Sequence, residues 1–207
     1  MDLRTHARDE RADLLDFLKS LSPEQWEAPT LCSAWRVRDV VAHLLSYDDL
    51  SSPQLMRRSA QGWFVLNRVN AVGVTEYNQR TPEELVAFLE AHLDPRGLPA
   101  FFGSMPALVD GMIHQQDMRR PLGMPREIPA DRLVPTLRAA WTAPAVRGIW
   151  RARGLRLVAT DVDWSAGRGA EVHGRGEALL MAMGFRRGVA AELSGPGQPK
   201  LAQRIKA

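Results

Sequence analysis

Two ionisable residues interrupt an otherwise apolar stretch, and both are good metal ligands. Within residues 106–114 (PALVDGMIH), only Asp110 and His114 carry ionisable side chains. They are four residues apart, so a helix places them on one face, about 6 Å from each other. Burying a carboxylate and an imidazole costs several kcal/mol unless each finds a partner, and a divalent metal ion is one such partner. Asp117 continues this face by another turn.

A third ligand must come from elsewhere in the chain, and His43 is the best candidate. It lies at the edge of the apolar face of a predicted helix that begins near Val37. Facing helices of a bundle bring such ligands together in the core, and two His with one carboxylate leave an open coordination position, as in catalytic zinc sites. The alternative is structural: His43 would hydrogen-bond a neighbour such as Asp39, and Asp110 and His114 would pair with each other or with arginines.

The elements that must position these residues are mainly helices. Apolar residues at three- and four-residue spacings predict a first helix that ends near Ser20. Capping boxes at Ser22 and Thr81, each followed by proline, predict two more helix starts. Further helices are predicted over residues 55–69, 106–120 and 130–141.

The pattern changes after Arg153. The segments LRLVAT, AEVHG and AELSG are typical of short strands, EALLMAMGF is typical of a helix, and glycines separate them. We therefore expect a mainly α fold, with a helical bundle over residues 1–150 and a small α+β domain over residues 154–207.

The composition excludes several classes of protein. The 27 basic residues are spread among 24 acidic ones, which is not the one-sided charge of a nucleic-acid-binding face. The chain lacks the roughly 18 consecutive apolar residues of a membrane span and the apolar run of a signal peptide. Cys32 is the only cysteine, so intrachain disulfides and Cys-rich zinc sites are excluded. We expect a cytoplasmic monomer or homodimer that binds neither nucleic acid nor membranes.

Cys32 itself is not predicted to be catalytic. It lies in a turn flanked by tryptophan, with no histidine within several residues, and a lone cysteine is more often a small buried hydrophobe. Trp26 and Trp35 are likewise interpreted as packing residues.

Two segments resemble the mycothiol-dependent maleylpyruvate isomerase family, a branch of the DinB-like bundles. The first, PTLCSAWRVRDVVAHLL, is similar to the signature that opens the family: a Cys, a Trp three residues on, and an Asp four residues before a His. The second, VDGMIHQQDMRRPLG, resembles the family's helix in which a carboxylate, a His four residues later and an Asp three beyond precede a Leu-Gly ending. The two segments occur in the family's order and at about its separation.

The resemblance implies a DinB-like four-helix bundle with a small C-terminal α+β domain. It also implies one divalent metal, usually zinc, on His43, Asp110 and His114, with Asp117 as a polar catalytic residue of the site. The family's isomerases carry Glu where this chain has the shorter Asp110. A family arginine that follows the apolar helix of the C-terminal domain contributes to the active site, and Arg186 is the nearest match.

Two functions from different classes are compatible with this site. In the first, mycothiol or a similar low-molecular-weight thiol enters the open coordination position, loses its proton and adds to a small electrophilic substrate, in an S-transferase or isomerase reaction. Arg186 or another arginine of the cleft would then bind an acidic substrate. In the second, the bundle binds a metal or senses a ligand without catalysis, and both Asp110 and the short C-terminal region favour this alternative.

Overall fold

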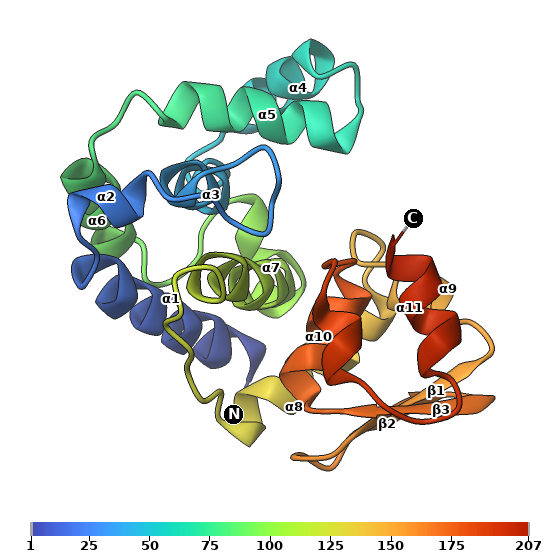
Figure 1. Cartoon of the computed structure of the whole chain (residues 1–207). Coiled ribbons are helices and arrows are strands. Elements are labelled where there is room, and N and C mark those ends of the chain that lie inside the picture. Colours follow the sequence, from blue (N-terminus) through green and yellow to red (C-terminus); the bar gives the residue numbers. More distant parts are fainter. Residues whose placement is uncertain (1, 207) are drawn as a thin grey trace. The chain divides into compact units, whose positions relative to one another are not determined.

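The computed structural model describes residues 2–206, which are mainly helical (Figure 1). Contacts within the chain divide it into two compact units, Met1–Pro125 and Arg126–Ala207. The helices of the first unit are α1 (Leu3–Lys19), α2 (Pro23–Trp26), α3 (Val37–Leu45), α4 (Ser52–Gln61), α5 (Leu66–Tyr77), α6 (Pro82–Ala91), the 3-10 helix η1 (Leu98–Ala100) and α7 (Phe101–Arg119).

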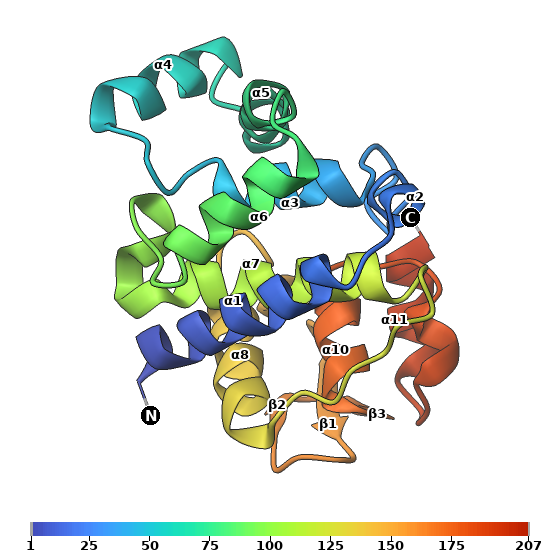
Figure 2. The same ribbon diagram turned by 90° about the vertical axis from the view of Figure 1, so that its left-hand side faces the viewer.

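The core of the first unit lies between α1, α3, α6 and α7. Helix α7 runs beside α1 in both views (Figures 1 and 2), and these two helices have the most extensive contact in the chain. Their apolar faces follow the three- and four-residue spacing of the sequence, so one stripe of each helix faces the others. The buried core residues include Leu14, Leu18, Val40, Val41, Leu85, Leu89 and Met118.

A buried ion pair fastens α1 to the segment that follows α3. The two terminal guanidinium nitrogens of Arg11, Nη1 and Nη2, donate to the carboxylate of Asp48, each over 2.9 Å. The same carboxylate accepts a hydrogen bond from the backbone N–H of Arg96, and Arg11 also donates to the carbonyl of His92. Since every charge is satisfied, the pair can be accommodated in the interior and fixes how α1, α3 and α6 meet.

The second unit is a small α+β structure. Strand β1 (Leu155–Ala159) lies in the centre of a three-stranded sheet, antiparallel to β2 (Ser165–Gly167) and parallel to β3 (Ala170–Gly174). Leu157 pairs with Ala166 on one side and Val172 on the other. The remaining elements are α8 (Ala130–Thr142), α9 (Gly148–Arg151), α10 (Gly176–Met183), the 3-10 helix η2 (Val189–Glu192) and α11 (Gln198–Lys206).

The predicted fold class, mainly helical with a small α+β part at the C-terminal end, is confirmed. The predicted domains, 1–150 and 154–207, place the boundary after residue 150, whereas the two compact units meet after Pro125. Helix α8 belongs to the second unit because it packs against α10. An apolar helix face does not reveal from sequence which neighbour it covers. Within residues 2–206, no helix combines the length and the apolar character that crossing a membrane requires.

Two predicted elements are wrong. The helix expected over residues 55–69 is two helices, α4 and α5, because Trp63 and Phe64 both have positive φ and turn the chain. No regular strand forms at AELSG: its first two residues, Ala191 and Glu192, end the 3-10 helix η2, and only an isolated bridge joins Ser194 to His173. In both segments the apolar residues support either structure, so composition alone could not decide.

Candidate metal centre

Helix α7 supplies most of the polar side chains of the candidate site. Positive φ at Phe102, Gly103 and Ser104 separates its first residues from a regular helix that begins near Pro106. Every residue of this helix over 107–118 is buried except Asp110. The carboxylate of Asp110 is 49% exposed, so the site has one open side although it is built on a buried helix.

His43 of α3 meets Asp110 and His114 of α7. His43 Nε2 lies 3.1 Å from Asp110 Oδ2, and His114 Nε2 lies 3.4 Å from Asp110 Oδ1. One potential ligand atom from each residue falls within 4.8 Å of the other two. The side chains of His43 and His114 are only 6% and 8% exposed. The structure thus brings together the three side chains that the sequence nominated.

These separations suit a metal ion. The ligand atoms of a tetrahedral zinc lie about 2.0–2.2 Å from the ion and therefore about 3.4 Å from one another. Each imidazole nitrogen lies about this far from one oxygen of Asp110, His43 Nε2 3.1 Å from Oδ2 and His114 Nε2 3.4 Å from Oδ1. The side chain of Asp110 is therefore long enough to act as a ligand beside both rings, even though the family's isomerases carry Glu here. The assignment of these residues as metal ligands stays a prediction.

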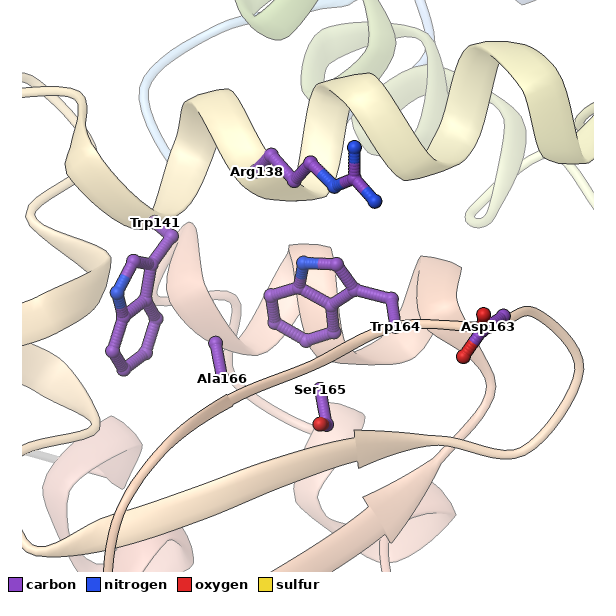
Figure 3. A pocket seen from close by; sticks show the side chains of 6 residues that line it. All are labelled: Arg138, Trp141, Asp163, Trp164, Ser165 and Ala166. Carbon is purple, nitrogen blue, oxygen red and sulfur yellow. The ribbon is translucent and has the colours of Figure 1, made fainter.

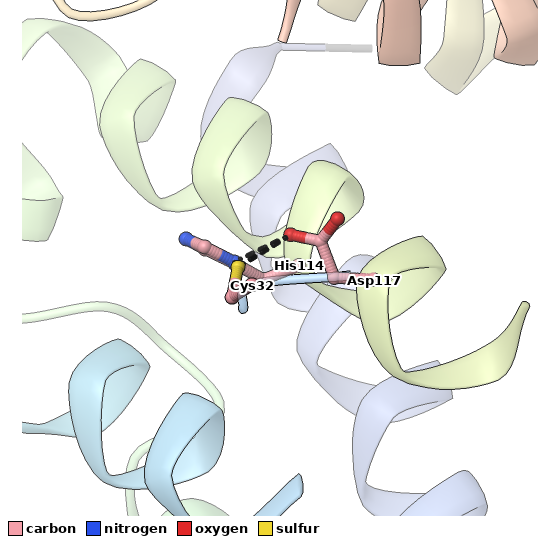
Figure 4. Close-up of side chains that lie close together, drawn as sticks. All are labelled: Cys32, His114 and Asp117. Carbon is pink, nitrogen blue, oxygen red and sulfur yellow. Dashed lines mark hydrogen bonds and ion pairs between the residues drawn. The ribbon is translucent and has the colours of Figure 1, made fainter. Parts of the chain in front are cut away.

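Asp117 holds the other nitrogen of His114. Its Oδ2 lies 2.9 Å from His114 Nδ1, and its side chain is fully buried. A carboxylate at this distance favours a proton on Nδ1, so Nε2 is the ring nitrogen that faces Asp110. Figure 4 shows this contact together with Cys32, whose sulfur lies beside both residues. Cys32, His114 and Asp117 form a second group that could hold a metal ion.

Aromatic rings pack against the imidazole of His43. Trp35 packs over its imidazole at a centroid distance of 4.9 Å, and Tyr47 meets it edge-on at 6.2 Å. Its buried Nδ1 has no hydrogen-bond partner among residues 2–206. Asp39, the neighbour considered in the structural alternative, instead accepts hydrogen bonds from Arg36 and Asn78.

The charges of the site act strongly on one another. Burial alone would lower the pKa of His114, but the charge of Asp110 and the hydrogen bonds with Asp110, Asp117 and Cys32 raise it well above its usual value. Burial alone would raise the pKa of Asp110, but the charges of His114 and His43 and the hydrogen bonds of both rings hold it well below its usual value. Without a metal, the site therefore favours a proton on His114 and an ionised Asp110.

Comparison with known proteins identifies a matching family. Residues 7–101 match the mycothiol maleylpyruvate isomerase N-terminal domain family. This part of the chain belongs to that family. The matched residues include His43 and end before Asp110, so the match covers only one of the two helices that form the candidate site. The resemblance seen in the sequence is confirmed.

Nearly the whole chain has a fold similar to that of a solved structure. That structure is the crystal structure of a histidine-to-alanine mutant of the mycothiol-dependent maleylpyruvate isomerase. The TM-score is 0.63 at 16% sequence identity, and the match covers 94% of this chain and 91% of that chain. Similarity at this identity shows the fold alone. No curated protein matches the chain.

Arg186, the predicted substrate-binding arginine, lies in the C-terminal unit. It follows α10, is half-buried, and donates from Nη1 to the carbonyl of Gly184 over 2.6 Å. Its predicted role in the site stays a prediction.

The C-terminal unit also has an open pocket of about 460 Å³, lined by residues of α8, β2 and the loop before β2 (Figure 3). None of the predicted site residues lines it; the lining residues are Arg138, Trp141, Asp163, Trp164, Ser165 and Ala166.

The sequence did not indicate that Cys32 is part of the site. A lone cysteine predicts a small buried hydrophobe, but Cys32 is only partly buried and its sulfur contacts Asp117 and His114. These partners are 85 and 82 residues away along the chain, so local spacing carried no signal for the contact.

Proposed function

We propose that this protein is a metal-dependent S-transferase or isomerase that uses mycothiol or a similar low-molecular-weight thiol. Its site would lie in the N-terminal unit, with His43, Asp110 and His114 holding a divalent cation, zinc in the first instance. The observation that carries the proposal is the convergence of two buried imidazoles on one half-exposed carboxylate. Membership of residues 7–101 in the mycothiol maleylpyruvate isomerase family supports the choice of thiol.

The ligand set suits catalysis better than a purely structural site. Three protein ligands leave a further coordination position, and the exposed edge of Asp110 gives that position access from solvent. When bound, a divalent cation would supply a Lewis acid that stabilises the thiolate form of an incoming thiol. Asp117 would hold the proton of His114 on Nδ1, so that Nε2 stays available as a ligand.

The second substrate would be a small electrophile, and its acidic character is inferred from Arg186. A guanidinium binds a carboxylate through two parallel hydrogen bonds and so selects acidic substrates. We place the reaction in the cytoplasm, where free thiols persist.

The test is metal-dependent thiol conjugation. Metal-free protein, mycothiol and monochlorobimane are mixed, zinc is added, and formation of the fluorescent conjugate is followed. The proposal predicts zinc-dependent conjugation by the natural protein and by Asp16→Asn, a control change of an exposed carboxylate on α1, but not by Asp110→Asn. If all three proteins bind zinc and none accelerates conjugation, the site serves as a non-catalytic metal or ligand sensor.

A further inference from the structure

The loop that carries Cys32 is fixed in place by the backbone. The N–H of Leu31 donates to the carbonyl of Asp117 over 3.0 Å, which joins the loop directly to α7. The hydroxyl of Thr30 accepts from the N–H of Cys32 over 3.1 Å, and the N–H of Trp35 donates to the carbonyl of Cys32 over 2.8 Å. Cys32 therefore holds a defined position over α7.

The thiol of Cys32 lies beside two polar side chains. Its sulfur lies 3.2 Å from Asp117 Oδ2 and 3.7 Å from His114 Nδ1 (Figure 4). The same carboxylate oxygen lies 2.9 Å from His114 Nδ1. One oxygen of a fully buried carboxylate is thus positioned to accept two hydrogen bonds, one from the imidazole and one from the thiol.

The tautomer of His114 decides the direction of these hydrogen bonds. If Nε2 faces the metal position, Nδ1 carries the proton and donates to Asp117. Nδ1 then has no free lone pair, so the thiol cannot donate to it. Asp117 Oδ2, which is also the closer of the two atoms to the sulfur, then accepts the hydrogen bond of the thiol.

We propose that Cys32 is a positioning residue, whose thiol donates to Asp117 and so fixes the carboxylate that orients His114 toward the metal. The inference rests on the proposed metal site. It adds Cys32 to the contact between Asp117 and the ligand His114. Groups that hold the ligands of a metal contribute strongly to affinity, because they fix both the tautomer and the direction of the ligand lone pair.

The experiment compares variants that differ in their ability to donate. Cys32→Val fills a similar volume without a donor, Cys32→Ala is a smaller second variant without a donor, and Cys32→Ser keeps a donor. Zinc affinity is measured by competition with a chromogenic chelator, and circular dichroism confirms that each variant is folded. We expect Cys32→Val and Cys32→Ala to weaken zinc binding about tenfold, the lower end of the range for residues that hydrogen-bond the metal ligands. The zinc affinity of Cys32→Ser should stay within about threefold of that of the natural protein.

A double-mutant cycle separates this role from general packing. In the Asp117→Asn background the acceptor is altered, so Cys32→Val should weaken zinc binding by less than about twofold. The absorption spectrum of the cobalt-substituted protein should change with Cys32→Val but not with Cys32→Ser, because only the former removes the donor that fixes Asp117, the partner of the His114 ring.

The results distinguish this inference from the proposed function. If the natural protein binds no zinc or cobalt, the proposed metal site itself is wrong. If it binds zinc and the donor-free variants bind equally well, Cys32 has no positioning role. A stoichiometry of two zinc ions that falls to one in Cys32→Val would also overturn the inference, since Cys32 would then be a ligand in the second group.

Discussion

The metal-free protein should lose stability as the pH rises, and Asp110→Asn should make that loss smaller. The pKa of His114 lies above its usual value of 6.5, because attraction to Asp110 outweighs its burial. A raised pKa contributes stability that is fully present below pH 6.5 and is lost as the pH rises through the folded-state pKa. The lowered pKa of Asp110 contributes stability above pH 3.8 that is lost as the pH falls through its folded-state pKa. The pair therefore stabilises the protein most between about pH 4 and 6.5.

The magnitude follows from the distance and the exposure of the pair. Two charges 3.4 Å apart attract by about 5 kcal/mol at an effective dielectric constant of 20. Desolvation of His114 and solvent screening of the half-exposed Asp110 oppose this attraction, so the net contribution should be about 1–2 kcal/mol, between the values for exposed and buried pairs.

Urea unfolding of the metal-free protein at pH 6 and pH 9 gives the test. The loss of stability from pH 6 to pH 9 should be about 1–2 kcal/mol larger in the natural protein than in Asp110→Asn, and Asp16→Asn should behave like the natural protein. An equal loss in the natural protein and Asp110→Asn would refute the assignment of this ion pair.

The buried pair of Arg11 and Asp48 gives another prediction: Asp48→Ala leaves the guanidinium uncompensated and should lower the free energy of unfolding by about 3–5 kcal/mol, measured by urea denaturation. A loss below about 1 kcal/mol would mean that the pair is not buried in solution. Zinc must displace the proton of His114, so the apparent affinity of the protein for zinc should increase by up to tenfold for each unit by which the pH rises toward 6.5. Calorimetry at pH 5.5 and 6.5 measures this affinity, and a value that does not change with pH would contradict the prediction. Arg186→Ala should raise KM for an acidic electrophile about tenfold while leaving KM for a neutral one unchanged, and equal effects on both would remove Arg186 from substrate binding.

The parts of the fold that depend on local chemistry could be predicted from the sequence. Thr81 is followed by proline and Glu84, and the observed capping box begins α6 at Pro82 as expected. The i, i+4 spacing of Asp110 and His114 was sufficient to place both on one helix face, because helix geometry fixes that relation.

The parts that depend on distant contacts could not be predicted. The contact of Cys32 with Asp117 requires a loop to fold back onto α7, and no local pattern encodes that approach. The break between α4 and α5 depends on the left-handed backbone of Trp63 and Phe64, residue types that rarely adopt it, so the apolar pattern continued through the turn. The packing partner of α8 was likewise decided by its neighbours and not by its own sequence.

Metal content measures the central claim most directly. The protein is loaded with zinc, passed through a desalting column and analysed for zinc per chain, beside His43→Ala and beside His173→Ala, a histidine of β3 in the C-terminal unit. The proposed centre predicts about one zinc per chain in the natural protein and in His173→Ala, and a large loss in His43→Ala, since three ligands are reduced to two. Equal zinc in the natural protein and His43→Ala would contradict the assignment of His43, Asp110 and His114 as one metal site.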